Sequence, residues 1–485
     1  MLRYALPSAL LIGALALLGR GSPKLPAAPA PDPGLEDASP LASLHVTPAR
    51  TATTGAEVMG INDPVSVPRL WIERGLIQPS QEPAELAADA KLAVNLGAHM
   101  ARGSTPTYPY LDMLSLSKSN WDWTRADLWV STVQAAGLEP LMMLGPWPGN
   151  QTANYTTSYL PSDLNAYSEY VRRVVERYDG DGKDDMPGLK RGVKYWEVDN
   201  EPDLHNSRPP RTGKAEGKPP RAAKPENFQT PGEYAKVLVA SAKAIRAADP
   251  SAKVATAGFF WPRSAEGRAY VTALVAEPGV LDAVDIVSVH CYFEENTLEP
   301  VARTLEIMSS AFPGKPIWVT ETSVPAKGSP EWQDEDWQAG MVAGIYGAFL
   351  AGGADRVFWH TLADPPFLLS KRATMPFATN SLLRAVREDM ASGDIRGPGP
   401  TNMEDKPAGA VYRRLASFLA NTDPKQYAEQ PANGGRLLWT GGGWLAFWGE
   451  PEAPKGAGPV TDLRTGAVST ASGAVKAPAW IGLAR

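Results

Sequence analysis

Two glutamates lie at the ends of two apolar runs, and this placement is typical of a pair of catalytic carboxylates. Residues 194–203 (KYWEVDNEPD) read as a buried strand that stops near Glu201, and residues 316–323 (PIWVTETS) repeat the pattern at Glu321, 120 residues later. In a (β/α)8 barrel the C-terminal ends of the strands meet at one mouth, where catalytic groups gather. An acid and a nucleophile at such a mouth can cleave a glycosidic bond.

The first run also contains carboxylates with different expected roles. Tyr195, Glu197, Asp199 and Glu201 fall on one face of a regular strand because side chains alternate. A bulge at the strand end would turn both Asn200 and Glu201 toward the mouth. Glu197 lies deeper, and we predict that it is a buried structural carboxylate with a partner, since an isolated buried charge is costly.

The elements that must position these groups follow an alternating pattern of strands and helices. Eight strands are predicted at Val58–Asn62, Ala98–Arg102, Pro140–Leu144, Val193–Asp199, Lys253–Phe259, Val284–Tyr292, Pro316–Thr320 and Arg356–Thr361. Helical periodicity separates them at Pro83–Leu96, Arg125–Ala136, Leu164–Tyr178, Gly232–Ala248, Tyr270–Ala276, Pro300–Ala311 and Asp336–Ala351. The pattern favours an α/β fold, a (β/α)8 TIM barrel with loop insertions. A doubly wound sheet is the competitor, but residues 60–64 lack its glycine-rich phosphate turn.

The flanking segments predict the domain organisation. Residues 1–22 form a signal peptide or N-terminal anchor, with a positive start and an apolar run that is short for a membrane span. Residues 23–42 are a Pro/Ala-rich linker. We therefore expect an exported protein, secreted or in the periplasm or cell envelope, without a stable membrane span unless the N-terminal segment stays uncleaved.

The remaining chain is expected to divide into two folded units. Residues 57–400 form the catalytic barrel, and residues 401–485 form a small antiparallel β-sandwich because short strands alternate with turn residues there. A strand from residues 43–56 is a possible addition to the sandwich. A basic, proline-rich insertion at residues 208–226 is either a solvated loop or a clamp for an anionic substrate.

Composition excludes several function classes. A net charge of −6 gives no general attraction to nucleic acid. Cys291 is the single cysteine, so no intrachain disulfide can form. The five histidines lack metal-ligand spacing, and no Gly-x-Ser-x-Gly elbow is present. We therefore expect no metal and no cofactor, and a carbohydrate as the partner of the site.

The two strand motifs, Asn-Glu-Pro and then Thr-Glu, resemble clan A of the glycoside hydrolases, in particular family 39, the β-xylosidase and α-iduronidase group, with family 5 next. The resemblance covers about residues 57–390. It implies an acid/base on strand four and a nucleophile on strand seven. Asp199 departs from the pattern, since family 39 often has Trp there, and strand three lacks the His found in family 5.

The resemblance also implies roles for individual positions. Glu201 matches the acid/base and Glu321 the nucleophile, while Asn200 matches the residue that binds the sugar 2-hydroxyl. The other matching positions are Arg102 beside the nucleophile, His290 and Tyr292 at the end of strand six, and Trp359 as the platform under the sugar ring. Trp147, in the loop after strand three, is a further candidate for substrate binding. Together they predict a retaining O-glycoside hydrolase that acts on poly- or oligosaccharides through two glutamates. The alternatives are a catalytically silent glycan-binding protein or a transglycosidase on the same barrel.

Overall fold

The largest sheet of the molecule is an eight-stranded parallel barrel. The computed structural model describes residues 49–62, 78–103, 123–144, 161, 163–203, 229–260, 262–293, 297–326, 334–364, 379–386 and 402–484. The strands run in the order β5-β4-β3-β2-β1-β8-β7-β6. They are β1 (Met59–Asn62), β2 (Met100–Gly103), β3 (Glu139–Leu144), β4 (Tyr195–Val198), β5 (Lys253–Ala255), β6 (Val287–Tyr292), β7 (Ile317–Ser323) and β8 (Arg356–His360). Parallel bridges from Ala255 to Ile286 and from Phe259 to Val289 join the two ends. The predicted (β/α)8 barrel is confirmed.

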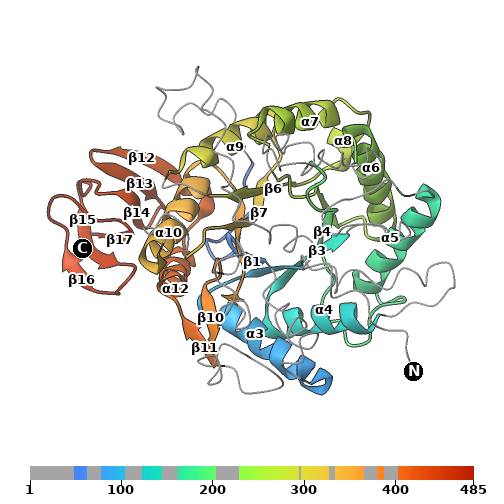
Figure 1. The fold of residues 1–485 in the computed structure, drawn as a ribbon, viewed down its shortest axis with the longest axis horizontal. Helices are drawn as coiled ribbons and strands as arrows, with labels where there is room; N and C mark the ends of the chain where they lie inside the picture. The colour runs from blue at the N-terminus through green and yellow to red at the C-terminus, as the bar shows by residue number, and fades with distance from the viewer. Residues whose placement is uncertain are drawn as a thin grey trace, which may run out of the picture.

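Helices surround this barrel, as Figure 1 shows. They are α3 (Glu82–Leu96), α4 (Thr124–Ala136), α5 (Leu164–Tyr178), α6 (Pro231–Ala248), α7 (Ala265–Val275), α8 (Val280–Ala283), α9 (Glu299–Ala311) and α10 (Glu335–Ala351). Local sequence sets several of their starts. Asp163 caps α5 by accepting hydrogen bonds from the amides of Asn165 and Ala166, and Thr230 with Glu233 forms a capping box at α6.

The barrel interior has an apolar floor below a charged layer. Met100, Leu141, Ala255, Ile286, Trp318 and Phe358 form a buried cluster in the lower half of the strands. Above it, Arg102 and Glu197 are fully buried and paired with each other. The apolar layer excludes water from below, so each charge above it must find its partner within the barrel.

The segment before β1 closes the underside of the barrel rather than extending a sheet. The backbone amides of Thr51 and Ala52 donate to Asp355 Oδ1 at 2.6 and 2.9 Å, and the Trp318 indole donates to Asp355 Oδ2 at 2.9 Å. Residues 49–56 contain no strand. The described part of the segment therefore does not show the strand considered for 43–56, and residues 43–48 lie outside the described residues.

A second unit follows the barrel and lies beside α10, at the left of Figure 1. Its six-stranded antiparallel sheet has the order β12-β13-β14-β17-β15-β16 and fits the predicted C-terminal β-sandwich. The strands are β12 (Ala428–Ala432), β13 (Gly435–Trp439), β14 (Gly443–Gly449), β15 (Ala457–Asp462), β16 (Val468–Thr470) and β17 (Ala479–Leu483). One side packs on the barrel helices: an added Cβ on Gly347 of α10 would lie 2.4 Å from Phe447.

A helix and a small sheet at the junction between the barrel and the C-terminal unit were not predicted from the sequence. The strands predicted after residue 401 are preceded by a helix that was not predicted, α12 (Pro407–Leu419), which packs against α10. Val411, Tyr412, Leu415 and Leu419 are buried at helical spacing, so the sequence did contain the signal. A small sheet of β9 (Ala363–Asp364), β10 (Leu383–Val386) and β11 (Asn402–Asp405) connects barrel and C-terminal unit.

Some predictions fall outside the described residues. These are the signal peptide or anchor at 1–22, the linker at 23–42, the basic insertion at 208–226, and Trp147. Within the described ranges, no helix has both the length and the apolar character needed to cross a membrane.

Candidate active site

Glu201 follows β4 in a tightly turned segment at the C-terminal end of the barrel. Asp199 and Glu201 both have positive φ, 75° and 49°, which is uncommon for residues other than glycine. The Asp199 side chain accepts from the Asn200 amide at 2.6 Å, and the Glu201 amide donates to the Gly258 carbonyl at 3.1 Å. These contacts hold the turn that presents Glu201 to the mouth. Such outliers cluster at functional sites.

Glu321 reaches the same region because the pairing of β7 is irregular. The β6–β7 register shifts between Val289 and His290, and the β7–β8 register shifts between Val319 and Thr322. In a regular strand Thr320 and Glu321 would point to opposite faces. Here the Thr320 hydroxyl donates to Glu197 at 3.0 Å, and Glu321 accepts from Arg102 at 2.6 Å. The irregularity lets both side chains face the barrel interior.

Arg102 organises the buried polar groups from β2. Its Nη1 donates to Glu321 Oε1 at 2.6 Å, its Nη2 donates to Asn200 Oδ1 at 2.9 Å, and its Nε donates to Glu197. The planar guanidinium can serve these acceptors at once, whereas a lysine ammonium has no such fork. Glu197 is thus a buried, ion-paired carboxylate, which confirms its predicted structural environment.

His290 lies between the two proposed catalytic carboxylates. Its Nδ1 is 2.7 Å from Glu201 Oε1 and 3.5 Å from Glu321 Oε2. One ligand-type atom from each of these three residues lies within 4.8 Å of the other two. The two carboxylates therefore approach each other closely at the mouth of the barrel, on either side of one imidazole.

The ring of His290 packs against Gly258, whose carbonyl accepts a hydrogen bond from the Glu201 amide. A Cβ built on Gly258 would lie 2.0 Å from His290 Nε2. Any larger side chain would therefore displace the imidazole. Gly258 also bridges to Asn200 in parallel pairing, so one residue positions both the turn and the ring.

Buried charges set the ionisation of the site. Burial alone would raise the pKa of Glu321, but His290, Arg102 and His360 outweigh burial and hold this pKa well below its ordinary value. Burial alone would lower the pKa of His290, whereas Glu321 and Glu201 together raise it. Glu321 is therefore a carboxylate at neutral pH, as a nucleophile must be.

Tyr292 completes the contacts of Glu321. Its hydroxyl donates to Glu321 Oε2, opposite the oxygen that Arg102 binds. Burial, together with the neighbouring charges of Glu321 and Glu201, keeps the pKa of Tyr292 well above its ordinary value. Tyr292 thus remains a hydrogen-bond donor across the neutral range.

The structure places Trp359 away from the mouth, and the prediction of a sugar platform at this residue is wrong. Its side chain is fully buried in the main hydrophobic core, and its indole donates to the Asn380 carbonyl at 2.8 Å. The next residue, His360, instead ends β8 at the site. Its Nδ1 lies 2.6 Å from Asn62 Nδ2, and its ring contacts Tyr292 edge to face at 6.1 Å. Strand alternation separates the two residues, because Trp359 and His360 point to opposite faces.

Sequence reasoning missed Asn62, Gly258 and His360. Asn62 ends β1 and accepts from Arg102 at 3.1 Å, and His360 ends β8 beside it. A polar residue at the last position of a barrel strand was the available signal for both. Gly258 gave no signal, because its role depends on contact with another strand.

Two described clusters have the donor types to hold a metal ion. One is Glu201, His290 and Glu321 in this site, and the other is Asp179, Asp181 and Asp185 on a distant loop. The contacts above engage the first cluster in hydrogen bonds with protein groups. These contacts suit acid–base and nucleophilic work by the side chains themselves.

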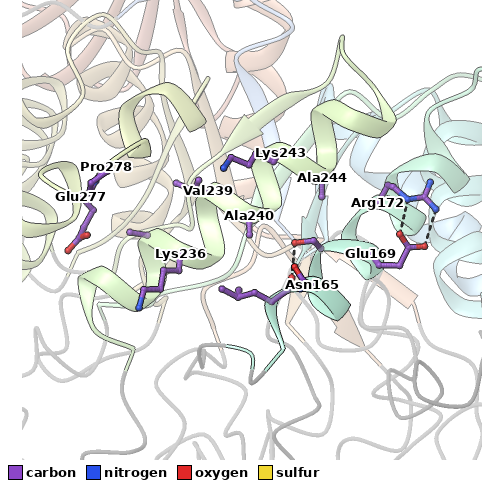
Figure 2. A pocket seen from close by; sticks show the side chains of 13 residues that line it. Asn165, Glu169, Arg172, Lys236, Val239, Ala240, Lys243, Ala244, Glu277 and Pro278 are labelled. Carbon is purple, nitrogen blue, oxygen red and sulfur yellow. Dashed lines mark hydrogen bonds and ion pairs between the residues drawn. The ribbon is translucent and has the colours of Figure 1, made fainter.

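A groove of about 680 Å³ lies elsewhere, on the outer face between α5 and α6. Figure 2 shows Lys236 and Lys243 from α6 on one side and the Arg172–Glu169 pair from α5 on the other. It contains none of the residues at the barrel mouth. The carboxylate site is therefore defined by its contacts and not by this groove.

Part of the chain matches a known protein-family model. Residues 179–343 match the model described as the glycosyl hydrolase catalytic core, which is about a third of the chain. The matched region contains both Glu201 and Glu321, and the predicted glycosidase class is confirmed. No protein with a curated description matches the sequence closely enough to be counted.

Several solved structures have a similar fold. A family 39 glycoside hydrolase from Bacteroides cellulosilyticus has 14% identity and a TM-score of 0.55, over 90% of this chain and 81% of that one. A family 39 β-xylosidase from Caulobacter crescentus has 17% identity and a TM-score of 0.50, over 86% and 84%. A family 51 α-L-arabinofuranosidase from Bifidobacterium longum has 11% identity and a TM-score of 0.52, over 90% and 98%. At these identities the likeness concerns the fold, which agrees with the family 39 resemblance of the sequence.

Proposed function

We propose that this glycosyl hydrolase is a retaining O-glycoside hydrolase in which Glu321 is the nucleophile and Glu201 the acid/base. The observation that carries the proposal is the shared contact through His290, whose Nδ1 lies 2.7 Å from Glu201 and 3.5 Å from Glu321. Both carboxylates thus flank one imidazole ring, and a nucleophile and an acid that act on one sugar must lie close together.

The environments of the two glutamates support different roles. Glu321 is held as an anion by the Arg102 guanidinium and the Tyr292 hydroxyl. Glu201 instead shares a hydrogen bond of 2.7 Å with Nδ1 of the His290 ring. Two carboxyl groups in unlike surroundings are the pattern of an acid/base paired with a nucleophile.

In the first step, a Glu321 oxygen attacks the anomeric carbon while Glu201 gives its proton to the glycosidic oxygen. The bond from the anomeric carbon to that oxygen breaks, the leaving group departs as an alcohol, and a glycosyl ester forms on Glu321. Asn200, held by Arg102 at 2.9 Å, is placed beside Glu201 to bind a hydroxyl of the same sugar. Such a contact strengthens as the transition state forms.

In the second step, the Glu201 carboxylate removes a proton from water as the water oxygen attacks the anomeric carbon. The ester bond to Glu321 breaks, the sugar leaves with its original anomeric configuration, and Glu201 is again protonated. Arg102 and Tyr292 stabilise the charge that returns to Glu321.

The test uses a panel of aryl glycosides with the full chain and the variants Glu201→Gln and Glu321→Gln. Aryl β-xylosides and aryl α-L-arabinofuranosides come first, since proteins of similar fold are named for those sugars. Each variant should lose about 10³-fold or more in kcat, because each removes a group that acts in the transition state. Retained activity in either variant would refute the assignment.

Trapping and product analysis separate the mechanisms. An activated 2-fluoro glycoside of the cleaved sugar should label Glu321, and peptide mass spectrometry would locate the ester. Labelling at another residue would overturn the nucleophile. Added acceptor sugars should leave hydrolysis as the main outcome, whereas transfer products in excess would identify a transglycosidase.

We also propose that the protein is exported, on the apolar run within residues 1–22. Fractionation of expressing cells, with N-terminal sequencing of the mature chain, tests this. Activity confined to the cytoplasm with an intact N-terminus would contradict export.

A further inference from the structure

A cluster of three aspartates lies in the loop between α5 and β4, far from the catalytic mouth. The loop sequence is Asp-Gly-Asp-Gly-Lys-Asp-Asp at residues 179–185. Oxygens of Asp179, Asp181 and Asp185 all lie within 4.8 Å of one another. The loop enters β4 at its N-terminal end, whereas Glu201 follows the C-terminal end of that strand. The two sites therefore lie at opposite faces of the barrel.

One of the three carboxylates is buried without a complete set of partners. Asp179 keeps only 6% of its exposure. Its Oδ1 accepts from the Asp181 amide at 3.1 Å, but its Oδ2 is buried with no hydrogen-bond partner. A buried carboxylate oxygen without a donor is costly. The Asp179 carboxylate is one of the three whose oxygens converge with Asp181 and Asp185, so the carboxylate with the unpartnered oxygen borders the same small volume.

In the described part of the chain, no lysine or arginine neutralises the negative charge of the three aspartates. Lys183 lies within the loop, but its Nζ pairs with Glu176 at 3.1 Å. No described lysine or arginine forms an ion pair with Asp179, Asp181 or Asp185. The folded loop thus gathers negative charge that a bound cation would neutralise.

We propose that Asp179, Asp181 and Asp185 form a calcium-binding site that fastens the α5–β4 junction. Hard oxygen ligands select Ca²⁺ or Mg²⁺ over softer metals. Two oxygens on one Ca²⁺ can be up to about 5 Å apart, twice the usual 2.3–2.6 Å bond, and the cluster satisfies this limit. Mg²⁺ has shorter bonds and a strict octahedral geometry, so a loop of mixed carboxylates favours Ca²⁺. Backbone carbonyls and water would supply the remaining ligands.

The backbone around the loop shows what the ion would stabilise. The Met186 amide donates to the Arg177 carbonyl and the Val193 amide to the Tyr178 carbonyl, each at 2.7 Å. A Cβ on Gly192 would lie 1.9 Å from the Asp179 carbonyl oxygen, so the chain entering β4 passes directly against the cluster. Groups at the N-terminal face of such barrels serve stability. Calcium should therefore change the melting temperature far more than activity.

The test compares thermal unfolding of the EDTA-treated full chain with and without about 1 mM CaCl2, a concentration suited to weak extracellular-type sites. Calcium should raise the melting midpoint by a few degrees at pH 7.5, as expected for a ligand that binds only the folded state. MgCl2 at the same concentration should give a smaller rise than calcium.

Two variants test whether the ion binds at this cluster. Asp181 is exposed, and Asp181→Asn keeps an oxygen that can accept from the Lys183 amide, a contact of 2.8 Å in the wild type, so this variant should fold. It should weaken calcium binding at least tenfold and remove the calcium-dependent shift. Asp184→Asn is the matched control, since Asp184 is exposed and lies outside the cluster, and its shift should equal that of the wild type.

A direct probe separates this site from the catalytic carboxylates. Terbium should bind one ion per chain with emission sensitised by Tyr178, which packs edge to face on Trp123 at 6.2 Å. Glu321→Gln should retain that emission, and Asp181→Asn should lose it. The proposal fails if calcium shifts no midpoint in the wild type, if Asp181→Asn keeps the full shift, or if magnesium acts equally. Because these experiments measure stability and ion binding and not hydrolysis, their outcome does not depend on the proposed catalytic roles.

Discussion

Gly258→Ala is the substitution that most directly tests how the fold positions the acid/base. The added Cβ would lie 2.0 Å from His290 Nε2, whereas ordinary contact begins at 3.4 Å. The imidazole must therefore retreat by at least 1.4 Å, and it cannot then keep both its 2.7 Å contact with Glu201 and its 3.5 Å contact with Glu321. A misplacement of about 1 Å in a catalytic site can cost 10²-fold in rate, equivalent to about 2.7 kcal/mol. Overpacking should also lower the free energy of unfolding by about 1–3 kcal/mol.

The assay is kcat/KM on a series of aryl glycosides with good and poor leaving groups. The loss should be larger for poor leaving groups, because they depend most on proton donation by Glu201. Gly442→Ala is the matched control, since its added Cβ meets nothing closer than 3.8 Å, and it should match the wild type in rate and stability. The reasoning is refuted if Gly258→Ala folds and retains wild-type kcat/KM across the series.

Three further predictions follow from the buried contacts. Arg102→Gln should lower the free energy of unfolding by about 3–5 kcal/mol in denaturant titrations, because it leaves the Glu197 and Glu321 carboxylates without their buried cation; a change below 1 kcal/mol would contradict this. Trp359→Phe should cost about 1 kcal/mol for the lost hydrogen bond to Asn380 but leave KM unchanged, and a large rise in KM would restore Trp359 as the platform. The depressed pKa of Glu321 contributes stability that is present above pH 4.5 and is lost as pH falls toward the folded value. Glu321→Gln should therefore show a shallower loss of stability than the wild type below pH 4.5, and parallel acid-unfolding curves would argue against the depressed pKa.

Much of the barrel was predictable because its signals are local. The strand ending at Asn62 and the helix from Leu164 to Tyr178 matched the expected bounds closely, since apolar runs, helical periodicity and caps depend on neighbours in sequence. Strand five was predicted through Phe259, but its regular pairing ends at Ala255, and only isolated bridges continue. Pairing length depends on the adjacent strand, which the local sequence does not contain.

The same division applies to the site. From the sequence alone, Glu201, Glu321 and Arg102 could be placed near the C-terminal ends of three core strands. The tertiary structure decided that the β7 register shifts bring Thr320 and Glu321 to one face, and that His360 rather than Trp359 borders the site. The physical reason is that the face taken by a side chain at a strand end depends on pairing with a distant strand. Contacts between strands, such as Gly258 against His290, exist only once the barrel has closed.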